Sequence, residues 1–504
     1  MCMPHDRLCG AVRSIAVGSG LFASLAGTAQ IPAAISDHEL CSEVVESADG
    51  ARHDKAALMY GLLLDDQQHA VASEHAYKLA LRDLRTGVPD GKLPGGPRGT
   101  RRPVAVLMCT KGLPEDDAVT RRAADHLIKS VGVSAIVSQT TRQALVTQRA
   151  IAASGASVLH VCESCGTELR ATLEGIGDPS LVFQNPPSRA SFTPMILKKL
   201  PELEAHVRER RGFDGSAKIR VALLRPRDGA QLFGRALDET LLINGSAAAL
   251  QKGTNYLPVD YATARTGGGT DRHETAAAAV AAFRPHIVLG VAFEREIVAI
   301  LDAVERRLDP SAPRPLYWGW TPHGGLVAFI AANDDRRTRV YSYLPGMPAG
   351  PEQRERQKAA AADFAREFPG VPVASVFIHY GAPYQIMYAA AAAGALRQGR
   401  LTGADLARGI GITQTPGARP VYIGRRDLAV GLDAAAIGPI ALQNLHPGHP
   451  LNWSQNPSGA PMVDHGRIYC FTRNPSTGAL VETSAGQVWE RKTNSLTGTF
   501  VPCS

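Results

Sequence analysis

Apolar residues along the middle of the chain form short continuous runs, and stretches with helical spacing separate them. The first clear runs are Val104–Met108, Ser134–Val137 and Ser157–Val161, and the stretch between the first two places apolar residues at Ala123 and Leu127. Continuous apolar strands that alternate with helices are typical of a parallel sheet covered on both faces. The pattern therefore predicts an α/β lobe with a doubly wound, Rossmann-like sheet.

The same alternation repeats later in the chain and predicts a second lobe of the same kind. Its expected strands are Ile219–Leu224, Asn255–Pro258, His286–Gly290, Pro315–Trp320 and Val340–Leu344. Its expected helices are Met195–Val207, one beginning near Gly234, Glu274–Phe283 and Arg295–Leu308. Two such lobes whose loops face each other form a cleft, a common place for a small-molecule site.

A chain of 504 residues is too long for one core, and its pattern divides it into five segments. We expect an N-terminal segment, a first lobe, a second lobe, a return to the first lobe, and a third crossing followed by a small β extension. The corresponding ranges are 1–54, 55–193, 194–344, 345–430 and 431–504. Hinges are expected at the crossings near Pro194, Pro345 and residues 415–440.

The amino terminus has features of a signal peptide. Arg7 and Arg13 precede the apolar run Ser14–Ala26, with small residues after it at Gly27–Ala29. Glycine and serine dilute the run, so a disordered start is the alternative. The even count of eight cysteines fits an oxidising compartment, and together these features favour a periplasmic or extracytoplasmic location.

Two cysteines lie where a bridge would hold the carboxyl terminus. Cys470 ends a predicted strand and Cys503 is the penultimate residue, so a disulfide between them would tie down a tail that otherwise frays. The sequence does not reveal the pairing of the other six cysteines, which are Cys2, Cys9, Cys41, Cys109, Cys162 and Cys165.

Cys162 and Cys165 form the only C-x-x-C motif, and His160 lies two residues before it. A disulfide with Cys109 or plain burial is favoured over a redox dithiol or a metal site. A structural zinc site needs four ligands, and no second pair with metal-ligand spacing exists. We therefore predict no metal.

Composition and motifs exclude several classes. Hydrophobic residues make up 44% and charged residues 20%, and a net charge of +7 is spread without a basic stripe, which argues against nucleic acid as a partner. No apolar run is long enough to span a membrane. The sequence contains no G-x-S-x-G, H-E-x-x-H or Walker motif, and Gly267–Gly269 reads as a flexible turn. An enzyme is thus the minor interpretation, and we expect no cofactor.

Polar loops follow two predicted strands of the first lobe, namely Ser138–Thr141 and Cys162–Cys165. In doubly wound sheets ligands bind beyond the carboxyl ends of the strands, so both loops are candidate site walls. The first loop could equally cap the following helix. Glu163, the only carboxylate in the two loops, could bind a cationic group or simply be solvated.

Four segments carry a resemblance to a known family: Ala123–Val137, Ala153–Leu169, Leu232–Arg235 and Tyr380–Gln385. Their order and spacing over residues 55–465 resemble the type 1 periplasmic solute-binding proteins of ABC importers, in particular the leucine/isoleucine/valine-binding branch. The resemblance implies two lobes that close over a small polar solute, such as an amino acid, an amide or a related compound. It also implies a membrane permease or a membrane sensor as partner; a sensing domain without transport is the alternative.

The resemblance also implies a set of ligand-binding residues from both lobes. These are Ser138, Gln139, Thr140, Thr141, Glu163, Ser164, Cys165, Phe233, Phe293, Trp320, Thr321 and Tyr380. The alternatives are core packing for Phe233 and Phe293, interlobe packing for Trp320, and an ordinary surface position for Tyr380. The acidic residue that meets a ligand ammonium in the family is absent, since Thr321 or His323 stands in its place, which argues against an α-amino acid.

Overall fold

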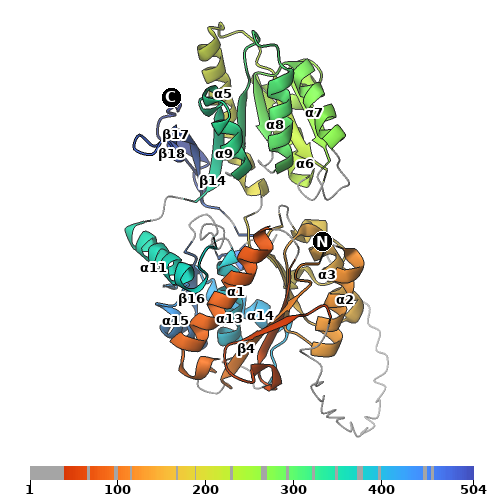
Figure 1. Cartoon of the computed structure of the whole chain (residues 1–504), viewed down its shortest axis with the longest axis vertical. Coiled ribbons are helices and arrows are strands. Elements are labelled where there is room, and N and C mark those ends of the chain that lie inside the picture. The colour runs from red at the N-terminus through yellow and green to blue at the C-terminus, as the bar shows by residue number, and fades with distance from the viewer. Residues whose placement is uncertain are drawn as a thin grey trace, which may run out of the picture.

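A computed structural model describes residues 39–503 with short gaps. The gaps are residues 65–67, 96–99, 114–115, 166–168, 188, 228–230, 263–269, 291–294, 321–323, 347–349, 372–378, 395–398, 446–450, 456–458 and 462. The described part of the chain forms two lobes, one above the other in Figure 1, each built on its own sheet.

The first-lobe sheet has its central strand in β2, with the spatial order β1-β4-β2-β5-β6-β7 and β3 beside β4. Strands β4, β2, β5, β6 and β7 run parallel, as the continuous apolar runs predict. Their bounds are β1 Glu43–Glu46, β2 Leu58–Leu63, β3 Lys92–Leu93, β4 Arg102–Cys109, β5 Ala135–Ser138, β6 Leu159–Cys162 and β7 Val182–Gln184.

The second-lobe sheet repeats this order in its parallel part, β11-β8-β12-β13-β14, and then adds antiparallel strands β17, β18 and β19. The bounds are β8 Val221–Pro226, β11 Tyr256–Tyr261, β12 Ile287–Gly290, β13 Leu316–Trp320, β14 Val340–Pro345, β17 His465–Arg473, β18 Leu480–Glu490 and β19 Ser495–Thr497. Short pairs form outside the two sheets, namely β9 Leu242–Ile243 with β10 Ser246–Ala247, and β15 Arg419–Tyr422 with β16 Ile440–Gln443.

Helices pack on the faces of both sheets, so the strands are buried on both sides. The first lobe carries α1 Gln68–Gly87, α2 Asp117–Asp125, α3 Thr141–Ser154, α4 Leu169–Thr172, α11 Pro351–Glu367, α13 Gly381–Gly394, α14 Gly403–Thr413 and α15 Leu428–Ile437. The second lobe carries α5 Thr193–Arg211, α6 Gln231–Thr240, α7 Thr270–Phe283, α8 Arg295–Arg307, α9 Gly324–Ala331 and α10 Asp334–Arg337. The predicted fold class is confirmed.

The chain crosses between the lobes from the carboxyl ends of strands. After β7 it enters α5, which packs in the second-lobe core, and after β14 it enters α11, which packs in the first. The carboxyl edges of the two sheets are therefore the edges that the crossings join. The third crossing lies between β16 and β17, later than the expected 415–440 region, because β15 and α15 of that region still pack in the first lobe.

The structure refines the predictions made from sequence for both ends of the chain. Part of the expected N-terminal segment belongs to the first lobe, because β1 pairs with β4 at the edge of the sheet and Cys41 is bonded to Cys109. The run Glu43–Glu46 is too short and too polar to read as a strand by pattern alone. At the other end, the β extension continues the second-lobe sheet, and the predicted disulfide between Cys470 and Cys503 is confirmed.

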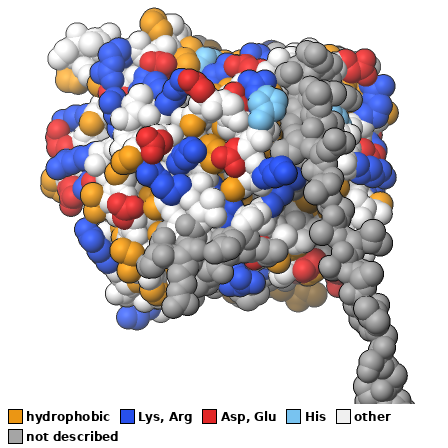
Figure 2. All heavy atoms as spheres, turned by 90° about the horizontal axis from the view of Figure 1, so that it is seen from below, with side chains coloured by type: hydrophobic (Ala, Val, Ile, Leu, Met, Phe, Trp, Pro, Cys, Tyr) orange, Lys and Arg blue, Asp and Glu red, His pale blue; other side chains and the backbone are white. Residues whose placement is uncertain are grey.

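None of the described helices is long and apolar enough to cross a membrane. Charged side chains of both signs are interspersed across the first-lobe face seen in Figure 2.

Candidate functional site

The loop after β5 begins the helix α3 and places four candidate residues at the carboxyl edge of the first-lobe sheet. The Thr140 hydroxyl accepts a hydrogen bond from the Gln143 amide at 3.1 Å and caps the helix. In return, Gln143 Oε1 accepts from the Gln139 amide at 2.9 Å. The capping interpretation is thus confirmed for Thr140. It leaves Thr141 as the first helical residue, half-buried at the edge.

Glu163, in the loop after β6, is completely buried. Its Oε2 accepts hydrogen bonds from the Ser73 hydroxyl at 2.5 Å and from Gln139 Nε2 at 3.1 Å. His379 Nδ1, from the segment that leads into α13, lies 2.9 Å from the same oxygen. The alternative that this carboxylate is solvated is therefore wrong, because the loop turns it inward beneath α1.

Burial, the largest single influence, raises the pKa of the Glu163 carboxyl, but the charge interaction and the hydrogen bond with His379 lower it. The hydroxyls of Ser73 and Tyr77 also lower it, so that the pKa of Glu163 falls below its ordinary value. The carboxylate is ionised at neutral pH, and the groups that stabilise it belong to the protein itself.

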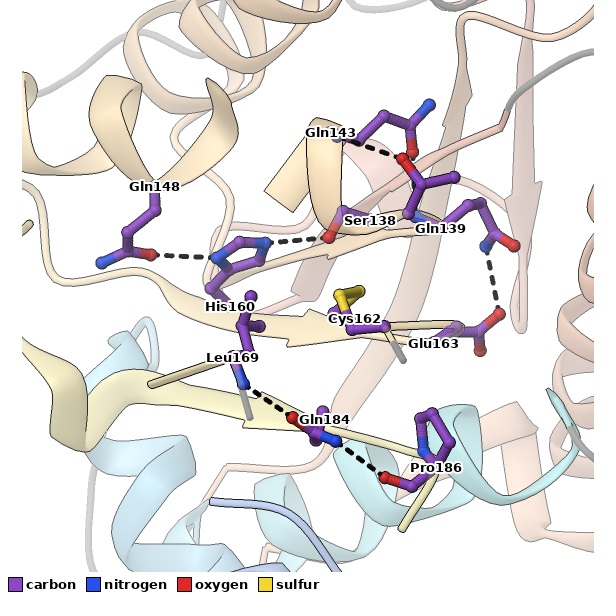
Figure 3. The surroundings of a disulfide bond; sticks show 12 residues. Ser138, Gln139, Gln143, Gln148, His160, Cys162, Glu163, Leu169, Gln184 and Pro186 are labelled. Carbon is purple, nitrogen blue, oxygen red and sulfur yellow. Dashed lines mark hydrogen bonds between the residues drawn. A yellow bond between two sulfur atoms is a disulfide. The ribbon is translucent and has the colours of Figure 1, made fainter. Parts of the chain in front are cut away.

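A second buried chain of hydrogen bonds runs beside the first (Figure 3). His160 Nδ1 lies 2.9 Å from Gln148 Oε1, and its Nε2 lies 3.0 Å from the Ser138 hydroxyl. Burial lowers the pKa of His160 to about 3, so the ring is neutral at neutral pH. Because a glutamine oxygen only accepts, Nδ1 carries the proton and Nε2 accepts from the hydroxyl. Ser138 is thereby fixed to the protein interior.

A disulfide between Cys162 and Cys165 closes the loop that carries Glu163 and Ser164. Both sulfurs are buried. Of the two favoured alternatives, the bridge to Cys109 is wrong, because Cys109 lies at the end of β4 and bonds to the N-terminal segment. Burial is confirmed, but the two cysteines are also bonded to each other. The loop is held further by Gln184, whose Oε1 accepts from the Leu169 amide at 2.9 Å.

The structure thus sorts the first-lobe candidates into two groups. Five are buried, and the side chain of each is bound to the protein by hydrogen bonds or a disulfide; they are Ser138, Gln139, Thr140, Glu163 and Cys165. Two are half-buried hydroxyls without a hydrogen-bond partner among the described residues, Thr141 and Ser164. Of the described candidates in this lobe, Thr141 and Ser164 therefore keep their hydroxyls available at the edge.

Tyr380 lies in the first-lobe core rather than at the surface. Its ring is 1% exposed, and its hydroxyl is bonded to Asp83 Oδ2 at 3.0 Å and to the Tyr384 hydroxyl at 2.7 Å. The surface alternative is wrong, because α13 is the buried central helix of this lobe. A ligand contact by Tyr380 stays a prediction.

The second-lobe candidates cannot be placed in the same way. Phe293 and Thr321 lie outside the described residues, as do the side chains of Phe233 and Trp320. Trp318, two residues before Trp320, packs in the second-lobe core with its ring centroid 5.8 Å from that of Tyr343.

At the carboxyl end of β8, the second lobe presents an arginine that is fully paired. Arg225 Nε donates to Asp260 at 2.7 Å, and its Nη1 lies 3.2 Å from Asp238. Lys252 also lies 3.1 Å from Asp238. These four charges are therefore balanced within the lobe.

Sequence analysis missed Ser73, Gln143, Gln148 and His379, which hold the candidate loops. His379 had a usable signal, because it directly precedes the segment Tyr380–Gln385 that carried the family resemblance. Ser73 and the two glutamines lie on helices, where polar residues give no sign that they turn inward. Within the described residues no cluster of histidine, cysteine and acidic side chains could hold a metal ion.

Comparison with solved structures defines the fold of this chain. The leucine-binding protein LivK of Thermotoga maritima MSB8 matches with a TM-score of 0.52 at 11% identity, over 85% of this chain and 98% of that one. The substrate-binding protein LivJ of Streptococcus pneumoniae, in complex with isoleucine, matches with a TM-score of 0.50 at 12% identity, over 85% and 99%. A solute-binding protein of an ABC transporter from R. palustris, in complex with benzoate, matches with a TM-score of 0.50 at 12% identity, over 89% and 100%.

The chain therefore has the two-lobed fold of type 1 periplasmic binding proteins. No family model matches the sequence, and no curated protein matches it.

Proposed function

We propose that this protein binds a small polar solute between its two lobes, outside the cytoplasm, for uptake by an ABC-type importer. It acts as a receptor and not as an enzyme. The observation that carries the proposal is the pair of half-buried hydroxyls, Thr141 and Ser164, at the sheet edge from which the chain crosses to the other lobe. The buried network behind them holds both loops in place.

The chemistry of this edge favours a ligand that presents an oxygen to the first lobe. The amino-terminal amides of α3 lie beside Thr141, and such a helix end attracts negative charge. The solved structures with isoleucine and benzoate contain ligands that carry a carboxylate. An amino acid, an amide or a related compound fits this arrangement, while the missing acidic residue near Thr321 argues against an α-amino acid.

Closure would follow from binding in proportion to the difference in affinity between the closed and open lobes. We place the first lobe at residues 43–193 with 345–443 and the second at residues 194–344 with 465–497, joined by hinges at the three crossings. A membrane permease would then read the closed form. A sensing role is the second candidate, and permease and ATPase genes beside this gene would favour transport over sensing.

A thermal-shift screen of amino acids, amides, polyamines and sugars tests the proposal. A ligand at ~100 times its dissociation constant adds about 2.7 kcal/mol to the free energy of unfolding. The Thr141→Ala/Ser164→Ala variant should lose the shift and keep its unliganded stability. Ser180→Ala, an exposed serine near the amino end of β7, is the matched control and should keep the shift.

Two results would count against the proposal. One is the absence of a shift with every compound in the panel. The other is a shift that the Thr141→Ala/Ser164→Ala variant retains in full. Turnover of any compound by the purified protein would instead favour an enzyme.

A further inference from the structure

A pocket of about 310 Å³ opens at the amino edge of the second-lobe sheet, opposite to the carboxyl edge where the crossings leave. His286 precedes β12, Leu316 begins β13 and Arg339 precedes β14, so the pocket lies at the amino ends of these strands. Arg211, at the end of α5, forms another wall. The crossings between the lobes leave from the carboxyl ends, so this pocket is separate from the proposed solute site.

The lining of the pocket carries a large excess of positive charge. Four arginines line it, Arg210, Arg211, Arg314 and Arg339, against the single carboxylate of Asp335. That carboxylate is already engaged, because it lies 2.8 Å from Nε of Arg339. The other face of the Arg339 guanidinium is neutralised by Glu305 behind the pocket, at 2.9 and 3.2 Å.

The remaining arginines hold carbonyl oxygens instead of carboxylates. Arg211 Nη2 donates to the carbonyl of Arg314 at 2.8 Å, and Arg314 Nη1 donates to the carbonyl of Glu305 at 2.8 Å. Neither side chain has a carboxylate partner within the part of the chain that the structure describes. Arg210 donates to Thr338, and its nearest carboxylate oxygen, on Asp335, lies 3.9 Å away.

Arginines at the end of a helix commonly stabilise its carboxyl terminus and adjacent loop carbonyls. That role uses one nitrogen of Arg211 and one of Arg314. The two positive charges remain without a carboxylate partner among the described residues. The positive charges crowd one another: burial, together with Arg220, Arg210 and Arg339, lowers the pKa of Arg211 to about 10. The group is still charged at neutral pH, so the repulsion persists.

His286 adds an uncharged donor to the same wall. Its Nδ1 accepts a hydrogen bond from the backbone amide of Arg220 at 3.0 Å. Burial and the charges of Arg211 and Arg220 lower the pKa of His286 to about 4, so the ring is neutral at neutral pH. The proton of the neutral ring therefore sits on Nε2, which can donate.

We propose that this pocket is a second binding site that takes a phosphate-type oxyanion, either free or as the terminal group of a small phosphate ester or lipid headgroup. Guanidinium groups match the oxygens of such an anion with paired donors, and four arginines beside a single carboxylate that is already engaged favour a multiply charged ligand. The volume is at the lower end of the range for ligand pockets, which suits one such group. The interspersed charges on the first-lobe face contrast with this concentration of one sign (Figure 2).

Isothermal titration with inorganic phosphate, at constant ionic strength set by chloride, tests the site. The Arg211→Gln/Arg314→Gln variant should bind phosphate about tenfold more weakly or worse, since hydrogen bonds to charged groups are the strong ones. Arg426→Gln, an exposed arginine of the first lobe, is the matched control and should bind as the wild type does. Absence of phosphate binding by the wild type, or unchanged binding by the double variant, would overturn the proposal.

A further variant and a second arm complete the test. If the double variant does not fold, Arg210→Gln replaces it, since that side chain is 40% exposed and its loss leaves no buried gap; binding equal to wild type would then overturn the proposal. Co-sedimentation with phosphatidic acid vesicles distinguishes the sources. Vesicle binding that inorganic phosphate displaces assigns a lipid headgroup to the pocket, and phosphate binding without vesicle binding assigns a free anion or a soluble ester.

Discussion

At the carboxyl edge of the first-lobe sheet, the buried charge of Glu163 meets Ser73, Gln139 and His379. At the amino edge of the second-lobe sheet, Arg211 instead donates to the carbonyl oxygens of Pro313 and Arg314. Both places gather charge around the ends of parallel strands of the same order. The first compensates its charge from within the chain and so can hold a binding edge in place. The second sets four arginines against the single lining carboxylate of Asp335, and we propose that an anion from outside completes it. A cluster of charged residues therefore indicates a ligand only after its internal partners have been counted.

Removing the compensated charge of Glu163 should have the largest effect on stability. Glu163→Ala leaves the donors of Ser73, Gln139 and His379 without their acceptor, so we expect a loss of about 3–5 kcal/mol in the free energy of unfolding, as for other broken buried pairs. Urea unfolding measures it. Glu355→Ala, whose partner Lys358 is a solvent-exposed neighbour on the same helix, should change nothing measurable. A Glu163→Ala variant as stable as wild type would show that the network is not a structural unit.

The disulfides of the two lobes give a second contrast. Removing Cys470–Cys503, with a sequence separation of 33, should cost about 4 kcal/mol on the chain-entropy account. Removing Cys162–Cys165, with a separation of 3, should cost only about 2 kcal/mol. The smaller loss should nevertheless weaken solute binding more, because it frees the loop that carries Ser164. Paired serine variants, compared by urea unfolding and by thermal shift with the solute, test this. Equal effects of both pairs on binding would contradict it.

The buried histidine of the first lobe makes its stability depend on pH. The pKa of His160 is about 3 in the folded protein against 6.5 for an ordinary histidine, so the unfolded chain takes up a proton first as the pH falls. Stability is therefore complete above about pH 6.5, and roughly 3 kcal/mol is lost by about pH 4.5. Glu163, with its lowered pKa, adds its own loss only below about pH 4.3.

Unfolding at a series of pH values measures this loss, and a variant isolates its source. His160→Gln should reduce the dependence between these pH values and leave the part due to His286, whose pKa is lowered to about 4. His53→Gln, at an exposed site, should leave the dependence as in the wild type. A full wild-type slope in the His160→Gln variant would assign the loss to other groups.

The smallest expected effect concerns the uncompensated charges. Added sodium chloride should raise the free energy of unfolding by about 0.5 kcal/mol, because salt screens the repulsion around Arg211. Arg211→Gln should reduce this gain, and Arg426→Gln should not. Salt dependence that is identical in the three proteins would mean that the arginine pocket carries no net repulsion.

Much of the fold was predictable because apolar spacing is local. The runs at Val104–Met108 and His286–Gly290 became strands β4 and β12 with ends shifted by one or two residues. The misses occurred where pattern is weak, as in the short polar strand β1, or where packing decides, as in α15, which still belongs to the first lobe. The two polar loops were found by their position after strands. Which of their side chains turn inward depends on helices far away in sequence and was not predictable.

The sequence by itself determined two α/β lobes, the candidate loops and the bridge at the carboxyl terminus, because these follow from periodicity and from the chemistry of local segments. Only the tertiary structure decided which residues become partners in hydrogen bonds, disulfides and charge clusters. It brought His379 to Glu163 across 216 positions of the chain, paired Cys109 with Cys41, and gathered arginines from α5 and two loops into one pocket. The physical reason is that compensation of charge and burial of hydroxyls are properties of neighbours in space, which a one-dimensional pattern does not contain.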